Sequence, residues 1–195
     1  METVASIDVA TAELPALIAE AAAVGAEYQR RFGGLSAAQL NWRPNAEEWS
    51  IAYCVEHVIV ANATYAAPVG RILDGSKTTT LWERMPLLPG LFGRMLIRSL
   101  TPGARARVQA PKVFLPSATT VSDDVMSRFA VAQGELIALM ERCRALDTRA
   151  IIITSPAASF VTYSLLDAFR IIVVHLQHHL QQTSALLALP EFPRG

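Results

Sequence analysis

Apolar residues recur every three or four positions in four long stretches of the chain, at residues 11–32, 51–72, 125–143 and 164–189. The first stretch carries this pattern at Leu14, Leu17, Ile18, Ala21 and Val24. Since an α-helix completes a turn in about 3.6 residues, such spacing places the apolar side chains on one face. Each stretch is therefore predicted to form an amphipathic helix.

Four such helices, with no convincing strand alternation and no internal repeat, predict an all-α protein built as a four-helix bundle. The chain of 195 residues fits a single domain of this kind. Residues 73–120 contain several prolines and less regular spacing, and are expected to form a long crossover between the second and third helices. Residues 190–195 follow as a short tail. Two short apolar runs, residues 113–115 and 151–153, fit either strands or extended loops.

Residues that favour helix ends flank these stretches. Ser50 and Ser164 are placed to cap the second and fourth helices, because a serine hydroxyl accepts a hydrogen bond from a free N–H of the first turn. Pro190 stops the fourth helix. Pro68 is expected to kink the second helix or to end it early, because proline lacks the N–H that helical bonding uses. The predicted boundaries thus have a chemical basis as well as a periodic one.

The chain carries 17 basic and 17 acidic side chains, so its formal net charge is zero. A protein without surplus positive charge is a poor partner for nucleic acid, and this balance provides no polybasic anchor for a membrane surface. We therefore expect neither nucleic acid nor membrane as a partner. The sequence has no apolar stretch that could span a bilayer, no recognisable secretion signal and only two cysteines. These features favour a cytoplasmic protein.

The fourth predicted helix contains three of the four histidines of the chain, His175, His178 and His179. At about 100° per residue, His175 and His179 both fall on the apolar arc, whereas His178 falls at its border. Two rings four positions apart point the same way and can bind one divalent metal ion. The opposite side of this helix is predicted to be solvated and carries Arg170, Gln177, Gln181 and Ser184.

The fourth histidine, His57, lies at the flank of the apolar face of the second predicted helix. If it turns inward, three imidazoles from two helices meet, and such a site keeps a coordination position open, as catalytic zinc sites do. Neutral imidazole suits Zn, Ni, Fe or Cu. The alternative is that each ring is an ordinary hydrogen-bonded core residue. Cys54 is either a soft ligand or a small buried apolar residue, and Gln182 is placed to support a ligand ring.

Several motifs resemble those of the DinB-like superfamily, the YfiT-type metal-dependent bundle proteins. Leu35–Leu40 followed by Trp42-Arg43-Pro44 is similar to the family's connector before its second helix. Trp49-Ser50-Ile51 is similar to the start of that helix. His175–Gln182 resembles the family's terminal His-x-x-x-His motif. The resemblance covers nearly the whole bundle but not the crossover.

The resemblance implies four helices in up-down-down-up order and a divalent metal ion held by His57, His175 and His179. The metal in such proteins is often nickel or zinc. Characterised relatives are thiol-dependent, among them bacillithiol and mycothiol S-transferases, and the analogy favours a homodimer. The leading hypothesis is therefore a metal-dependent S-transferase, in which a small-molecule thiol loses its proton at the metal and attacks a small electrophile.

Two other functions stay open at this point. The same site can activate water, which would make the protein a metal-dependent hydrolase, or it can bind a metal or small ligand without catalysis. No separate general base stands out, because Tyr53, Glu56 and Asp167 fit a solvated helix face as well as an acid–base role. The apolar residues between Leu87 and Leu96 recur at helical spacing and fit a cover over the bundle, a dimer face or a lid.

Overall fold

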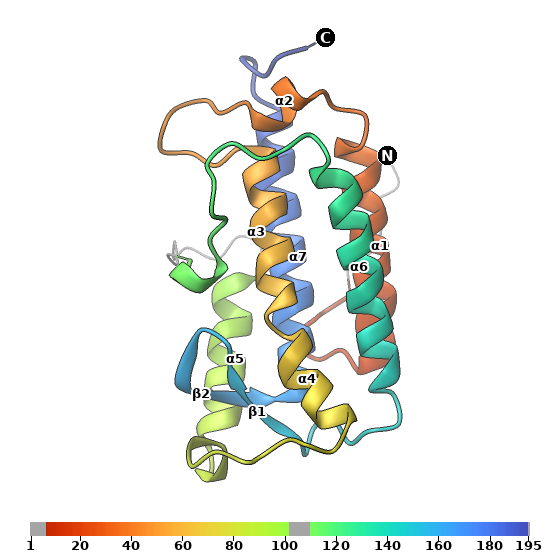
Figure 1. Cartoon of the computed structure of the whole chain (residues 1–195), viewed down its shortest axis with the longest axis vertical. Helices are drawn as coiled ribbons and strands as arrows, with labels where there is room; N and C mark the ends of the chain where they lie inside the picture. The colour runs from red at the N-terminus through yellow and green to blue at the C-terminus, as the bar shows by residue number, and fades with distance from the viewer. Residues whose placement is uncertain (1–6, 102–109, 195) are drawn as a thin grey trace.

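The computed structural model describes residues 7–101 and 110–194, which are mostly helical (Figure 1). The elements η1 and η2 are single turns of 3-10 helix. In chain order the elements are α1 (Leu14–Phe32), α2 (Ala37–Asn41), α3 (Ile51–Ala63), α4 (Ala66–Leu73), η1 (Trp82–Arg84), α5 (Leu88–Leu100), η2 (Lys112–Phe114), α6 (Val125–Arg142), β1 (Ile152–Ser155), β2 (Ala158–Ser164) and α7 (Leu165–Leu187). Helices cover most of each of the four stretches that periodicity marked as helical.

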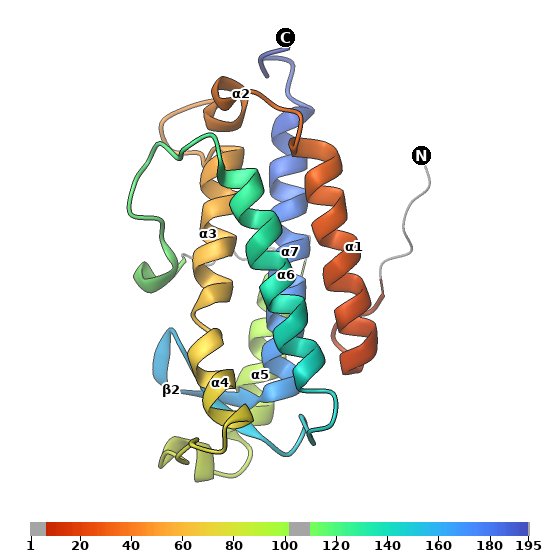
Figure 2. The ribbon, with the colours of Figure 1, turned by 45° about the vertical axis from the view of Figure 1, so that its right-hand side comes forward.

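Four of these helices, α1, α3, α6 and α7, pack side by side around the core (Figure 2). α1 contacts α6 and α7, and α3 contacts the same two helices. The apolar stripe of each helix therefore packs against two neighbouring helices. Its burial removes apolar surface from water, which is the main force that holds the fold together. The largest side chains without exposed surface in this core include Leu17, Tyr28, Phe32, Ile51 and Met140.

The second predicted helix is interrupted near its proline, as expected. α3 ends at Ala63 and α4 begins at Ala66, so that Pro68 lies in the first turn of α4, where its missing N–H breaks no helical hydrogen bond. The predicted caps are also present. The hydroxyl of Ser50 accepts a hydrogen bond from the N–H of Tyr53 at 3.1 Å, and that of Ser164 accepts one from Asp167 at 3.0 Å. The two helices that carry the histidines thus both start at capped residues.

The all-α prediction needs one correction, because β1 and β2 pair as an antiparallel hairpin. Ile152 lies opposite Ser164 and Ile153 lies opposite Tyr163. The hairpin packs against α5 and leads directly into α7. A pair of short strands is marginal by itself, and here the contact with α5 stabilises it. The other short apolar run, residues 113–115, is not a strand and lies at the end of η2.

The placement of Arg170 on a solvated helix face is wrong. Its side chain is buried, with Nε donating to the carbonyl oxygen of Ala12 at 3.0 Å and Nη1 donating to Asp167 at 2.9 Å. The reason is that α7 contacts α1, α3, α5 and the hairpin. The first half of this helix is therefore enclosed on all sides, and a wheel that assumes one solvated face cannot apply to it.

The stretch between α4 and α6 contains a further helix, α5, which packs against α7 and β2. Gly93 lies at the close approach of α5 to α7, since a Cβ on it would be 2.6 Å from a carboxylate oxygen of Asp167. The absence of a side chain at this position allows the two helices to touch. As a result α5 forms one side of the cavity described below.

Two further features of the fold concern the cysteines and the membrane. Cys54 and Cys143 are both buried and form no disulfide. None of the helices in residues 7–101 and 110–194 combines the length and the apolar character that crossing a bilayer would require.

Candidate metal centre

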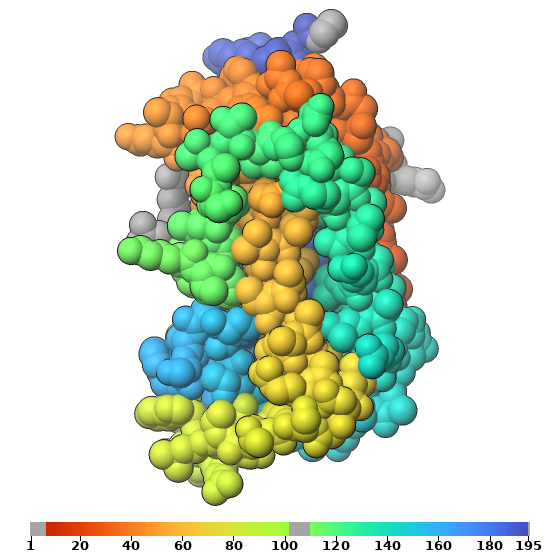
Figure 3. Space-filling model, viewed as in Figure 1, coloured from red at the N-terminus to blue at the C-terminus, as the bar shows by residue number. Residues whose placement is uncertain are grey.

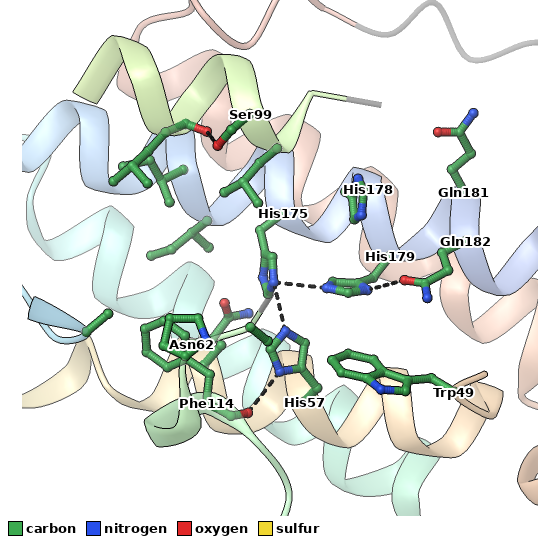
Figure 4. A pocket seen from close by; sticks show the side chains of 18 of the residues that line it. Trp49, His57, Asn62, Ser99, Phe114, His175, His178, His179, Gln181 and Gln182 are labelled. Carbon is green, nitrogen blue, oxygen red and sulfur yellow. Dashed lines mark hydrogen bonds between the residues drawn. The ribbon is translucent and has the colours of Figure 1, made fainter. Parts of the chain in front are cut away.

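Three histidines meet where α3 packs against α7 (Figure 4). His57 comes from α3, and His175 and His179 come from α7. The Nε2 atom of His175 lies 3.0 Å from Nε2 of His57 and 3.0 Å from Nε2 of His179. His57 and His179 are buried, and His175 is half-buried. The structure therefore brings together the same three residues that the sequence singled out.

In His57 and His179, the hydrogen bond of the ring nitrogen that points away from the cluster determines which nitrogen carries the proton. Nδ1 of His57 lies 2.8 Å from the carbonyl oxygen of Phe114, at the end of η2. Nδ1 of His179 lies 2.9 Å from the side-chain oxygen of Gln182. Because carbonyl and amide oxygens only accept hydrogen bonds, both Nδ1 atoms must donate. Both Nε2 atoms consequently present a lone pair toward His175.

The donor set fits a divalent metal ion. One N–H on His175 can donate well to only one of the two lone pairs that face it, whereas a cation between the three nitrogens satisfies all of them. Two ligands at right angles, each about 2.1 Å from a metal ion, are about 3 Å apart, which agrees with the observed separations. The cluster of His57, His175 and His179 can therefore hold one ion.

The surroundings keep these rings neutral, which is the form in which imidazole binds a metal. Burial, assisted by the nearby His57 and His178, lowers the pKa of His179 to about 3. Burial, followed by the neighbouring imidazoles, also holds the pKa of His175 well below its ordinary value of 6.5. The pKa of His57 is lowered by burial, although its hydrogen bond to Phe114 opposes the shift. Protons therefore compete weakly with a metal for these nitrogens.

We expect the metal-free protein to lose stability as the pH falls below about 6.5, the histidine pKa of the unfolded chain. Below about pH 6.5 the histidines of the unfolded chain bind protons, whereas the same rings in the folded protein stay neutral. The stability that these rings contribute is therefore fully present above about pH 6.5 and is lost as the pH falls toward their lowered pKa in the folded state. Each such ring lowers the free energy of unfolding by about 1.4 kcal/mol per pH unit. Urea unfolding of chelator-treated protein between about pH 7 and about pH 5 measures this slope. On unfolding, the His175→Gln variant should take up about one proton fewer than the wild type, so its free energy of unfolding should depend less steeply on pH. An equal slope of unfolding free energy against pH in the two proteins would contradict the prediction.

The fourth histidine, His178, lies apart from the cluster (Figure 4). It is half-buried, and its ring stands edge-on to that of His179 with 5.1 Å between the centroids. This position agrees with the border of the apolar arc where the wheel placed it. Cys54 has no exposed surface, and burial raises the pKa of its thiol well above the ordinary value. A thiol that resists ionisation suits a packing role better than metal binding.

The other acid–base candidates have structural partners. Glu56 pairs with Arg128 at 2.6 Å, and Asp167 pairs with Arg170 at 2.9 Å. The ring of Tyr53 packs edge-on against Trp49, with 4.9 Å between the centroids. None of these three side chains belongs to the histidine cluster.

Two residues at the site were not recognised from the sequence as part of it. Trp49 stacks on the ring of His179, with 6.0 Å between centroids and 13° between planes, and lies edge-on to His57 at 5.1 Å. Phe114 contributes its carbonyl oxygen. Trp49 was visible only as part of a helix-start motif, and a backbone carbonyl has no sequence signal because every residue carries one.

The three rings border a cavity of about 700 Å³. Its size falls within the range of small-molecule sites, about 300–1,000 Å³. Side chains from α3, α5, α7, the hairpin and the segment around η2 line it. Polar groups on its wall include Asn62, Ser99 and Gln181. Its apolar wall is formed largely by Ala61, Leu96, Leu100, Phe114, Ile171 and Ile172.

Comparison with protein families gives one match that spans most of the chain. The family model described as the DinB superfamily matches residues 20–183, a range that includes all four histidines. Comparison with curated proteins and with solved structures gave no match. The match covers α3 and nearly all of α7, the two helices that supply the histidine cluster.

Proposed function

The chain belongs to the DinB superfamily, and on this premise we propose that it is a metal-dependent enzyme that transfers a small-molecule thiol to an electrophile. The convergence of three Nε2 atoms at the wall of a cavity of about 700 Å³ is the observation that supports this most. Three protein ligands leave room at a metal for a substrate, as in catalytic zinc sites. We propose nickel or zinc, since imidazole nitrogens suit both.

We also propose that the four packed helices form an up-down-down-up bundle. In Figure 2 the chain rises through α1 and α7 and descends through α3 and α6. This order explains why His57 and the pair on α7 come from antiparallel neighbours, so that rings in the middle of both helices meet. A homodimer belongs to the same proposal and rests on the family resemblance alone.

A divalent cation held by the three rings would lower the pKa of a thiol in contact with it. The residues of the chain prepare the site for this. The carbonyl of Phe114 and the amide oxygen of Gln182 orient two rings so that Nε2 faces His175. Trp49 covers His57 and His179 from one side. The largely apolar wall of the cavity favours an apolar electrophile.

The proposed reaction forms one bond from sulfur to carbon. With an epoxide, the thiol sulfur attacks a ring carbon, the C–O bond breaks, and the oxygen keeps the electron pair and takes up a proton that balances the one lost by the thiol. With an alkyl halide, the halide leaves with the electron pair and the thiol proton passes to solvent. Neither version needs an oxidant or a reductant.

The test uses untagged protein loaded with zinc or nickel. Bacillithiol, mycothiol and cysteine are offered as thiols, and monochlorobimane and styrene oxide as electrophiles. We expect turnover that requires both metal and thiol and that His175→Ala abolishes. Hydrolysis of nitrophenyl acetate without thiol would favour the hydrolase alternative. Bound metal without turnover on either panel would favour non-catalytic binding and contradict the transferase proposal.

Replacing Gln182 with leucine is expected to lower metal affinity about 10–100-fold, because His179 loses the acceptor that orients its ring. Competition with a chelating dye measures the affinity. Gln181→Leu is the matched control, since the neighbouring Gln181 lines the cavity but is exposed and makes no hydrogen bond to His179. Equal losses in the two variants would show that Gln182 does not act through His179.

A further inference from the structure

The zero net charge of the chain hides an uneven distribution. Residues 84–122 contain six basic side chains and no acidic one. The acidic residue just before this stretch, Glu83, does not offset them at the surface, because its side chain is only 4% exposed and pairs with Lys77 at 2.7 Å. Three of the six, Arg84, Arg94 and Arg98, lie in η1 and α5 with exposed side chains, and within the described residues none of the three forms an ion pair. This part of the surface is therefore positive.

Large apolar side chains are exposed in the same place. They come from η1, the turn before α5, α5 itself and the hairpin, and we call this surface, with the three arginines, the η1–α5 tip. Figure 3 shows residues near 80–90 as the lowest atoms of the molecule, beside the hairpin. Most of the exposed large apolar side chains of the described residues belong to it: Leu81, Trp82, Met85, Leu87, Leu91, Met95 and Phe160.

Leu87 is the most exposed of the large apolar residues of the tip, with 87% of its surface accessible. Its φ of 71° lies in the left-handed region, which is unfavourable for a residue with a Cβ. The side chain of Leu87 lies mostly in water, so its burial cannot compensate for the unfavourable backbone conformation. An unfavourable backbone of this kind points to a role outside the folding of the chain itself.

The outer face of α5 combines both kinds of side chain. Arg94 and Met95 lie three and four residues after Leu91, Arg98 lies four and three residues after those two, and all four are exposed, so they form one stripe along the helix. The opposite face, with Gly93 and Ile97, is buried. Apolar side chains among arginines are typical of helices that lie at the boundary between lipid headgroups and acyl chains, where the long cationic side chains reach the phosphates.

We propose that the η1–α5 tip docks on the surface of an anionic phospholipid bilayer. Charge complementarity selects this occupant, because the tip is positive and apolar at once, and both properties favour a surface of phosphates over hydrocarbon. Its shape agrees, since a projecting tryptophan and leucines can enter a headgroup layer. Docking of this kind needs no helix that spans the membrane. The inference is independent of the chemistry at the histidine cluster.

Sedimentation with vesicles tests the proposal on the full chain. We expect binding to vesicles of equal parts phosphatidylcholine and phosphatidylserine, weak binding to pure phosphatidylcholine, and loss of binding as the ionic strength rises from about 0.05 M to about 0.5 M. Each arginine near an anionic surface contributes roughly fivefold, so Arg94→Gln with Arg98→Gln should lower the partition coefficient roughly 20-fold or more. Arg142→Gln, an exposed site on α6, is the matched control.

The apolar contribution has its own pair of variants. Leu91→Ser with Met95→Ser should weaken vesicle binding, whereas Val131→Ser, which changes a 62% exposed side chain on α6, should not. Unchanged circular dichroism and metal content show that the variants fold. The proposal fails if the protein binds neutral and anionic vesicles equally or neither of them. It also fails if light scattering shows a dimer that Leu91→Ser with Met95→Ser dissociates, since a second copy then covers the tip, or if DNA binds in place of vesicles.

Discussion

Replacing His175 with alanine should reduce bound metal from about one ion per chain to almost none. His175 is the central ring of the cluster, because its Nε2 lies 3.0 Å from the Nε2 atoms of both other histidines. Without it His57 and His179 remain as two ligands on different helices. Removing a ligand should lower metal affinity by more than the about 10–100-fold that follows from removing a hydrogen bond that supports a ligand. Elemental analysis of untagged protein after desalting measures the effect.

The matched control for this prediction is His178→Ala. His178 has the same chemistry and lies on the same helix, but it stands outside the cluster and should leave the metal content unchanged. Urea unfolding of the metal-free His175→Ala protein separates a lost ligand from a lost fold, because removal of a half-buried imidazole should leave a cooperative transition. Equal metal content in the wild type and the His175→Ala variant would refute the proposed site.

Replacing Phe129 with alanine should lower the free energy of unfolding by about 3–5 kcal/mol, through lost apolar burial and the cavity left behind. Phe129 is 1% exposed, and its ring on α6 packs against that of Tyr28 on α1 with 4.7 Å between centroids. The hydroxyl of Tyr28 donates to the carbonyl of Leu176 at 3.2 Å, one residue after His175. This contact thus connects three of the four packed helices.

Urea unfolding of the metal-free protein, monitored by circular dichroism, measures the effect of Phe129→Ala. Val131→Ala, on an exposed position of the same helix, is the control and should change stability by less than about 0.5 kcal/mol. A loss below about 1 kcal/mol for Phe129→Ala would mean that the core between α1 and α6 is not packed as described. Below its unfolding transition the variant should still bind metal, because the histidines come from α3 and α7.

Local sequence patterns were sufficient to predict the features that depend only on residues close together in the sequence. Periodicity located the four packed helices, and the capping serines marked the starts of α3 and α7. The spacing of His175 and His179 placed both rings on one face, because the helical repeat fixes the direction of side chains four residues apart. These predictions needed no knowledge of how the helices pack.

Predictions failed or stayed open where distant segments meet. The hairpin of β1 and β2 is stabilised by α5, and the burial of Arg170 follows from the helices and strands that enclose α7. The acceptor for His57 is a backbone carbonyl 57 residues away, whose position depends on the path of the chain between α5 and α6. The local positive charge of residues 84–122 disappears when charges are summed over the whole chain.

The amino-acid sequence alone determined that two imidazoles share a helix face, because that relation is set by the geometry of a single helix. Helix geometry did not determine that His57 joins them, which only the family resemblance implied, because His57 and His175 are 118 residues apart and meet where α3 packs against α7. The neutral state of the rings was likewise decided by tertiary structure. Burial by surrounding helices lowers their pKa values, and burial depends on contacts between segments that no local pattern encodes.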